Sequence, residues 1–286
     1  MLHPIRHMAE SKILRMQAEA VYNNPSLVNE LMRNYNKLLR KLKLSSSGNQ
    51  TASMPMMGFD VSGFNADTLV YLFKDVFLQG TYYFSSHKEQ PLIIDCGANI
   101  GTSVLFFKWL FPKASIHAFE PSPSIFQKLL ENTSKNKLNN VVCHNIALSS
   151  VAGPVIFFEP EGVPGSLTGS LTESRNAGKP IQVDAEKLSD FLKNNSIDEI
   201  DYLKMDIEGA ETDVFADLAE SGELNKVKQM GIEYHHNIQD SAMQLGAFLR
   251  IIEKAGFHYS IMGNGNPANS KQLQDVHIFA KSLSID

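Results

Sequence analysis

The spacing of apolar residues divides the chain into two parts near residue 50. Over residues 5–44 apolar side chains recur at helical spacing, with Pro25 between two such runs, a pattern typical of amphipathic helices. The polar, turn-forming stretch 45–58 then predicts a linker. We therefore expect a helical extension over residues 1–50 and a main domain over residues 51–286.

Beyond the linker, short apolar runs alternate with helical patterns. The run PLIID at 91–95 is too short for a helix and fully apolar in character, as buried parallel strands are. A helical pattern follows it and ends at Pro112. Repeated alternation of this kind predicts an α/β fold, a doubly wound sheet with right-handed crossovers. The expected strands are 91–95, 115–120, 141–148, 201–206, 229–234, 258–263 and 276–282.

Polar groups stand at the carboxyl ends of several expected strands. Doubly wound sheets bind their ligands at this edge, near the point where the strand order reverses. We therefore expect the ligand site among these groups, most of which contain an acid or a histidine. They are 95–101, Glu120, 145–148, 206–211 and 233–236.

The turn after the first of these strands discriminates between nucleotide ligands. The dinucleotide fingerprint G-x-G-x-x-G receives a pyrophosphate, but Asn99 and Thr102 replace its second and third glycines. Asp95 would repel a diphosphate and attract the ammonium and sulfonium of S-adenosylmethionine. Glu120 ends the next strand and can accept hydrogen bonds from both ribose hydroxyls. These residues favour S-adenosylmethionine, with S-adenosylhomocysteine as the product.

Several motifs together resemble the FkbM-type S-adenosylmethionine-dependent methyltransferase family. They are DCGANIG, FEP, NIAL, LKMDIEGAE and IEYHH, and the resemblance covers about residues 81–282, including TYYF at 81–84. It implies a Rossmann-like class I methyltransferase fold, with seven strands and the last antiparallel. It also implies methylation of a hydroxyl oxygen on a sugar, a macrolide or another secondary metabolite.

The resemblance also assigns a cofactor site in this sequence. The turn binds the methyl donor, the acid of the second strand holds the ribose, the end of the third strand lies near the adenine, and the fourth strand closes the site. The residues are Asp95, Gly97, Ala98, Asn99 and Gly101 in the turn, Glu120 at the ribose, Asn145, Ala147 and Leu148 at the adenine, and Asp206.

Methyl transfer to an alcohol requires an aligned acceptor oxygen and a group that removes its proton. Asp206 and Glu233 end two expected strands, and alternation along a strand places His235 on the same face as Glu233. We expect Asp206, Glu233 and His235 to be the catalytic residues. The same groups could bind Mg²⁺, but they have no diagnostic ligand spacing, so we expect no metal. Glu208 and Glu211 fit the N-terminus of the following helix, and a functional role for Glu208 is an equal alternative.

Composition and charge limit the kinds of partner that the protein is expected to bind. The net charge of −5 gives no attraction to nucleic acid or to an anionic membrane. No segment is long and apolar enough for a membrane span or a signal peptide. Cys96 and Cys143 are the two cysteines and lie in or beside apolar runs, which indicates reduced thiols. We expect a soluble, cytoplasmic protein that binds a small-molecule acceptor.

Two other functions fit parts of the same pattern. A nicotinamide-dependent oxidoreductase would use the same fold, but Asn99 and Thr102 disfavour it. A non-catalytic binding protein is disfavoured by the many acids at the strand ends. The glycine- and serine-rich loop 162–174 is either a surface excursion or a substrate lid. We expect the helices in 1–50 to cap the acceptor site and to contribute to a homodimer, with packing on the domain as the alternative.

Overall fold

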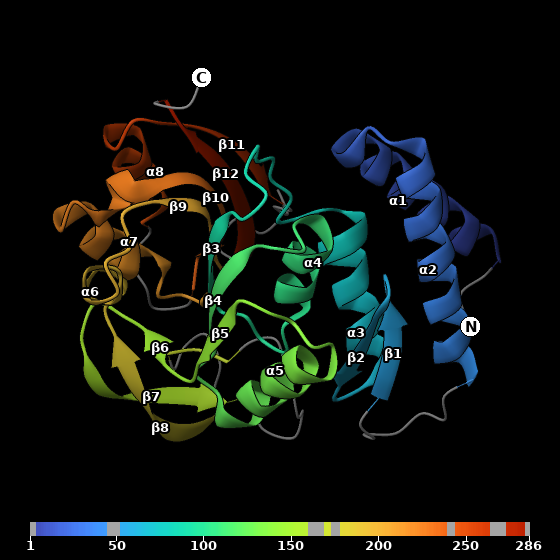
Figure 1. The fold of residues 1–286 in the computed structure, drawn as a ribbon, viewed down its shortest axis with the longest axis horizontal. Helices are drawn as coiled ribbons and strands as arrows, with labels where there is room; N and C mark the ends of the chain where they lie inside the picture. The colour runs from blue at the N-terminus through green and yellow to red at the C-terminus, as the bar shows by residue number, and fades with distance from the viewer. Residues whose placement is uncertain are drawn as a thin grey trace.

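A seven-stranded sheet forms the centre of the computed structural model, with helices on both faces (Figure 1). The structure describes residues 4–44, 52–159, 169–172, 178–238, 244–263 and 273–283. Within this part, β12 runs antiparallel to both of its neighbours, and the other strands run parallel to one another. The order confirms the predicted seven-stranded fold with a reversed last strand. It is β11 (Phe257–Gly263), β12 (Gln274–Ser282), β10 (Val227–His236), β9 (Ile200–Met205), β3 (Leu92–Cys96), β4 (Ser115–Phe119) and β5 (Val141–His144).

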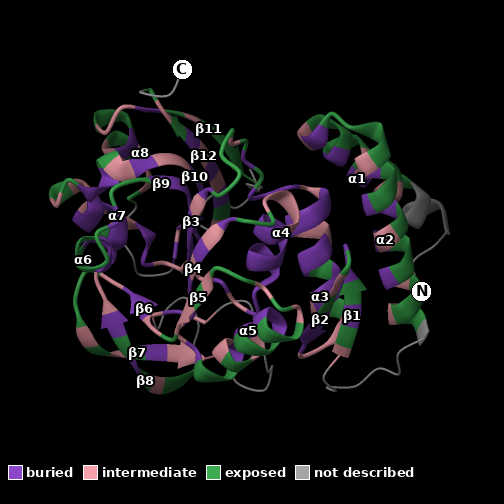
Figure 2. Cartoon of the chain, in the orientation of Figure 1, coloured by how far each residue is buried: buried purple, intermediate pink, exposed green. Residues whose placement is uncertain are grey.

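Consecutive residues of β3 belong to different hydrophobic cores, because side chains alternate between the two faces of a sheet. Ile93 packs in the core covered by α4 and α5, and Ile94 packs in the core covered by α6, α7 and α8. Figure 2 shows buried residues concentrated along the sheet between these helices. None of the described helices has both the length and the apolar character needed to cross a membrane. The elements are α4 (Thr102–Leu110), α5 (Pro123–Lys135), α6 (Leu188–Asn194), α7 (Glu211–Glu220), the 3₁₀ turn η3 (Glu223–Lys226) and α8 (Leu245–Lys254).

The two N-terminal helices, α1 and α2, pack against the outside of α3 and the π-helical segment η1 (Figure 1). The Tyr22 hydroxyl donates a hydrogen bond to the carbonyl oxygen of Phe77 at 2.6 Å. Leu31 is fully buried, in the same core as Phe77. The helices therefore contribute to the main hydrophobic core. Their bounds are Pro4–Tyr22 for α1, Pro25–Leu44 for α2, Ala66–Leu72 for α3 and Phe73–Leu78 for η1.

A β-hairpin occupies part of the expected linker, which corrects that expectation. β1 (Ala52–Met56) and β2 (Phe59–Gly63) are joined at Met57 and Gly58, whose φ angles of 47° and 92° suit a two-residue hairpin turn. On α5, the side chain of Asn132 accepts a hydrogen bond from the Ser62 backbone N–H at 2.8 Å and donates one to its carbonyl oxygen at 2.9 Å. The hairpin is thus fixed to the main domain. Residues 45–51 lie outside the described part of the chain.

The expected third strand divides between two sheets. β5 ends at His144, and the chain then forms β6, which pairs with β8 in a separate three-stranded sheet together with β7. This small sheet carries the segment from Ala147 onward away from the central sheet (Figure 1). Of the expected loop 162–174, only residues 169–172 are described. The strands are β6 (Ala147–Leu148), β7 (Gly153–Glu159) and β8 (Lys179–Glu186).

We expect the N-terminal helices to stabilise the whole domain. Leu31→Ala removes a fully buried side chain from the shared core, which should lower the free energy of unfolding by about 2–5 kcal/mol. Met16 on α1 is 60% exposed, so Met16→Ala should change it by less than about 0.5 kcal/mol. Chemical denaturation followed by circular dichroism measures both variants. If both variants lose an equally small amount of unfolding free energy, then α2 does not share the core in solution.

Candidate active site

A cavity opens at the carboxyl ends of β3, β4, β9 and β10. The chain order reverses between β3 and β9, so the cavity lies where doubly wound sheets bind their ligands. One wall consists of the turn after β3 and the residues after β4, and the opposite wall includes residues of α3 and η1. Eight predicted residues line it: Gly97, Ala98, Asn99, Glu120, Ala147, Leu148, Asp206 and Glu233.

The turn after β3 depends on its two glycines. Gly97 and Gly101 have φ angles of 82° and 89°, which glycine adopts without steric cost. A Cβ atom at Gly97 would lie 1.8 Å from the carbonyl oxygen of Asp206, so glycine is required for the turn to approach the end of β9. Gly101 does not line the cavity, and a Cβ there would meet the side chain of Leu129 on α5 at 2.8 Å. Gly101 therefore allows helix packing.

Glu120 presents a buried carboxylate to the cavity. Its two oxygens accept hydrogen bonds from the backbone N–H groups of Asn99 at 3.0 Å and Ser122 at 2.9 Å, and each oxygen keeps a lone pair for a ligand hydroxyl. Burial raises the pKa of Glu120 to about 7, although these hydrogen bonds lower it. Asn145 lies outside the cavity lining and donates to the Glu120 carbonyl oxygen at 2.8 Å. It holds the residues that follow β4, and its contact with adenine stays a prediction.

Asp95 lies beneath the turn and outside the cavity lining, so its contact with the ligand stays a prediction. It is fully buried, accepts a hydrogen bond from Ser103 Oγ at 2.6 Å, and lies 3.4 Å from the ammonium of Lys204. That ammonium also donates to the Gly97 carbonyl oxygen and lies 3.6 Å from Asp206. Burial lowers the pKa of Lys204, but the charges of Asp95 and Asp206 outweigh burial and raise this pKa above its ordinary value.

Acidic side chains gather at the other end of the cavity. The Tyr82 hydroxyl donates a hydrogen bond to Asp206 at 3.2 Å and reaches Glu233 at 3.5 Å. Burial, followed by the charge of Asp206, raises the pKa of Glu233 to about 9. Asp75 from η1 and Asp275 from β12 line the same end. This end can accept hydrogen bonds from several hydroxyls of one ligand.

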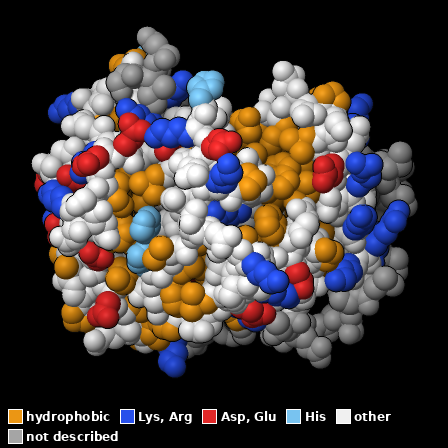
Figure 3. Space-filling model, viewed as in Figure 1, with side chains coloured by type: hydrophobic (Ala, Val, Ile, Leu, Met, Phe, Trp, Pro, Cys, Tyr) orange, Lys and Arg blue, Asp and Glu red, His pale blue; other side chains and the backbone are white. Residues whose placement is uncertain are grey.

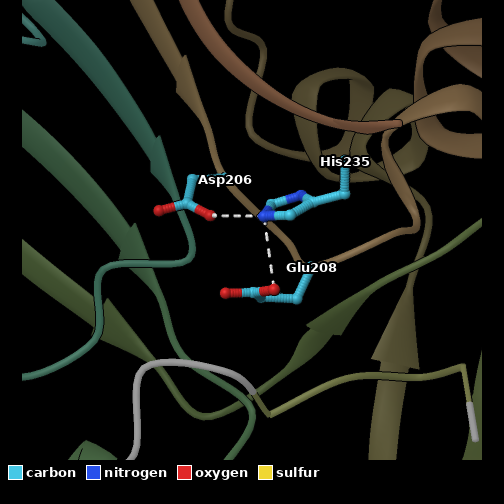
Figure 4. A group of neighbouring side chains, drawn as sticks. All are labelled: Asp206, Glu208 and His235. Carbon is cyan, nitrogen blue, oxygen red and sulfur yellow. Dashed lines mark ion pairs between the residues drawn. The ribbon is translucent and has the colours of Figure 1, made fainter. Parts of the chain in front are cut away.

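His235 lies outside the cavity lining, and Figure 4 shows its ring beside Asp206 and Glu208. Its Nδ1 is 2.8 Å from Glu211 Oε1, and its Nε2 is 3.2 Å from Glu208 Oε2 and 4.0 Å from Asp206 Oδ1. Burial lowers the pKa of His235, but Glu211, Glu208 and Asp206 outweigh burial and raise it to about 10. The side chain has no exposed surface, so His235 does not contact an acceptor directly. Its geometry fits a positioning role, and its predicted role as a catalytic base stays a prediction.

Sequence analysis did not predict several of the residues that line the cavity. Lys204 left a signal, because a lysine inside the apolar run DYLKMD requires an acid opposite it. Tyr71 and Asp75 left none, because the fold alone brings α3 and η1 to the cavity. None of the described residues of α1 or α2 lines the cavity, so α3 and η1 occupy the place that we expected residues 1–50 to cover. The residues missed are Tyr71, Asp75, Tyr82, Lys204 and Asp275.

The charge of the cavity fits a cationic methyl donor better than a dinucleotide. Lys204 is the one lysine or arginine among the described residues that line it, against six carboxylates. These carboxylates would repel a diphosphate, whereas S-adenosylmethionine carries a sulfonium and an ammonium. The carboxylate of Glu120 and the close backbone turn at Gly97 suit the nucleoside part. The six acids are Asp75, Glu120, Asp206, Glu208, Glu233 and Asp275.

The strand order, the reversed β12, the glycine turn and the acid after β4 define a class I, S-adenosylmethionine-dependent methyltransferase domain. Within that class, the sequence model of the family described as the methyltransferase FkbM domain matches residues 95–259, which are more than half of the chain. The chain belongs to the FkbM methyltransferase family.

Three curated relatives illustrate the similarity. Methyltransferase sdnD of Sordaria araneosa is 32% identical over 50% of this chain and 66% of its own length. The 2-O-methyltransferase NoeI of Sinorhizobium fredii is 28% identical over 58% of this chain and 72% of its own. The 31-O-demethyl-FK506 methyltransferase FkbM of Streptomyces tacrolimicus is 26% identical over 70% of this chain and 86% of its own length. The chain thus spans slightly less than two thirds of the sdnD protein.

We expect S-adenosylmethionine affinity to depend on pH through Glu120. In the predicted ribose site the ionised carboxylate would accept hydrogen bonds from both ribose hydroxyls, and the pKa of Glu120 in the free protein is raised to about 7. Affinity should therefore be full above pH 7 and fall as the pH decreases, by about tenfold for one unit below the pKa. Calorimetry at pH 6 and pH 8 measures this change.

The matched control is Glu120→Gln, which keeps the size of the side chain and cannot ionise in this range. Dividing the wild-type affinity by that of Glu120→Gln at each pH cancels the titration of the ligand itself. A ratio that stays constant between pH 6 and pH 8 would remove Glu120 from the ribose site.

Proposed function

We propose that this chain transfers a methyl group from S-adenosylmethionine to a hydroxyl oxygen of a neutral small molecule, such as a sugar or a secondary metabolite. One observation carries the proposal: a single cavity joins the turn and Glu120 to the carboxylates of Asp206 and Glu233. Methyl donor and acceptor can therefore meet in one enclosed site. NoeI and FkbM, whose names describe O-methylation, support an oxygen acceptor.

The residues at the acidic end would orient the acceptor and receive its proton. When bound, S-adenosylmethionine supplies a methyl group already activated for displacement. Asp206 can accept the hydrogen bond of the acceptor hydroxyl and take up its proton. Glu233, whose pKa is raised to about 9, is protonated at neutral pH and can donate a hydrogen bond to the acceptor. Tyr82 bridges these two carboxylates and fixes their orientation. Leu72 and Val76 line the same cavity and would exclude water from the acceptor oxygen.

The acceptor is proposed to be uncharged because of the acids around it. Asp75, Asp206, Glu233 and Asp275 all line this end, and a carboxylate or phosphate on the acceptor would be repelled by several of them. Hydroxyl groups, in contrast, donate hydrogen bonds to carboxylates. A neutral polyol matches these side chains best.

A cytoplasmic location and a small-molecule partner are further parts of this proposal. The two cysteines, Cys96 and Cys143, are both free, which fits a reducing compartment. A homodimer built on α1 and α2 stays a prediction, which light scattering of the purified protein can test.

Replacing the proposed proton acceptor should affect turnover far more than cofactor binding. Asp206→Asn keeps the shape of the side chain but weakens its basicity, so turnover should fall by about 10²–10⁴-fold. Its affinity for S-adenosylmethionine should change much less, because Glu120 and the turn remain. Release of S-adenosylhomocysteine measures turnover with a panel of hydroxylated acceptors, and mass spectrometry identifies the methylated product.

Glu131→Gln is the control for that variant, because Glu131 is an acid of α5 paired with Lys128 outside the cavity lining. It should keep wild-type turnover. If Asp206→Asn retains more than a tenth of wild-type activity, Asp206 does not take the proton.

We expect the enzyme to distinguish acceptors by charge. A neutral sugar derivative should be methylated with a kcat/KM at least about tenfold higher than its uronic acid counterpart, since a repulsion of only about 1.4 kcal/mol gives this factor. Asp75→Asn, which removes one charge from the acceptor side, should narrow the difference. Competition between the two acceptors, followed by mass spectrometry, measures the ratio. A preference for the uronic acid would contradict a neutral acceptor.

A further inference from the structure

Three potential metal ligands meet where the loop after β9 faces the end of β10. They are one carboxylate oxygen of Asp206, one of Glu208, and the Nε2 atom of His235, and these atoms all lie within 4.8 Å of one another. Figure 4 shows the two carboxylates directed toward the imidazole ring. Nε2 is 3.2 Å from Glu208 Oε2 and 4.0 Å from Asp206 Oδ1.

These distances suit a shared ion. Ligand atoms about 2.1 Å from a divalent cation lie about 3 Å apart when adjacent in an octahedron and about 4.2 Å apart when opposite. Both distances from Nε2 fall within this span.

The two oxygens of Asp206 face different partners. Oδ2 accepts the hydrogen bond from Tyr82 and lies 3.6 Å from Lys204. Oδ1 faces His235 instead. A metal bound through Oδ1 would therefore leave the hydrogen bond from Tyr82 intact, and the position of Asp206 would already be fixed.

His235 is oriented as metal-binding histidines are. Its Nδ1 is 2.8 Å from Glu211 Oε1, and the Glu211 carboxylate, almost fully buried, also accepts hydrogen bonds from the backbone N–H of Gly209. A carboxylate at Nδ1 keeps a proton on that nitrogen, so an ion that displaces the proton from Nε2 would meet a lone pair directed toward Asp206 and Glu208. This arrangement is the usual support of a histidine that coordinates a metal.

The Nε2 atom of His235 is buried and makes no hydrogen bond among the described residues, although it lies within ion-pair distance of Glu208 and Asp206. Buried polar atoms without a hydrogen bond are costly and uncommon. The side chain is fully buried and aims this nitrogen between Asp206 and Glu208. A cation between the three groups would satisfy the nitrogen and offset the repulsion of the two carboxylates.

We propose that Asp206, Glu208 and His235 bind one divalent metal ion in the wall of the cavity. Asp206 and Glu208 line the cavity, so the remaining coordination positions would face it and could hold water or an acceptor oxygen. One imidazole nitrogen with two carboxylate oxygens suits Mn²⁺ or Zn²⁺ better than Mg²⁺, which prefers oxygen ligands alone. From the sequence we expected no metal, because the candidate ligands have no diagnostic spacing. Spacing alone could not show that β10 brings His235 close to the loop after β9.

A second group, Glu233, His235 and Asp275, shares the same imidazole nitrogen. We favour Asp206 and Glu208 because Glu208 lies nearest to Nε2, whereas Asp275 is 3.9 Å away and about half exposed. The two possibilities differ in which carboxylate a bound ion requires.

Mn²⁺ binding to the whole protein tests the proposal without methyl donor or acceptor. Electron paramagnetic resonance measures free Mn²⁺ during a titration, and we expect one bound ion per chain. Glu208→Gln should weaken Mn²⁺ binding at least tenfold. Glu220→Gln, which changes an exposed acid of α7, should leave the affinity unchanged. Thermal melting of both variants confirms that they are folded.

The nitrogen ligand is tested without replacing His235. Pulsed electron paramagnetic resonance should detect coupling of bound Mn²⁺ to a ¹⁴N nucleus, which becomes ¹⁵N coupling in protein labelled at histidine. Absence of nitrogen coupling would overturn the proposal. So would equal Mn²⁺ affinity in wild type and Glu208→Gln, or binding lost in Asp275→Asn and kept in Glu208→Gln. None of these results bears on methyl transfer, which is measured separately by product formation.

Discussion

Asp95 and Lys204 stand opposite each other in the two central strands of the sheet, β3 and β9. Both are buried, and removing either partner of such a pair would leave an uncompensated charge in the core. The lysine ammonium also binds the Gly97 carbonyl oxygen and lies near Asp206. One cation therefore ties together the end of β3, the cofactor turn and the end of β9. The site requires the turn after β3 and the acids after β9 in fixed positions. Both positions depend on the Asp95–Lys204 pair.

The same pair explains the electrostatic character of the cavity. The positive charge of Lys204 is held beneath the turn by Asp95, so it offsets only part of the charge of the six acids that line the cavity. Such an excess of carboxylates favours ligands with positive charge or hydroxyl groups. The donor sulfonium, a divalent ion beside His235 and a neutral polyol all satisfy this condition. A dinucleotide does not, although the fold would accommodate one.

Features encoded within a few consecutive residues were predictable from the sequence. The strand, glycine turn and following acid gave the fold class, the cofactor turn and Glu120, because each depends on local pattern. Side-chain direction was not predictable in the same way. Asp95 lies near the end of β3, yet its carboxylate is buried against Ser103 and Lys204, which line the cavity in its place. The hairpin at residues 52–63 was missed because its turn, Met57–Gly58, lies within a polar stretch that reads as a linker.

The acceptor side of the cavity was the least predictable part, because it is built from segments that are distant in sequence. Phe73 and Phe77 of η1 are fully buried in the core that includes α1 and α2, whereas Asp75 and Val76 of the same segment line the cavity. A π-helical segment places these residues on different sides, a geometry frequent at functional sites. The N-terminal helices therefore act on the acceptor side indirectly, through η1. The turn side rests on β3, β4 and α5, whose apolar side chains belong to the same core, so both ends of the cavity depend on the packing of the N-terminal helices.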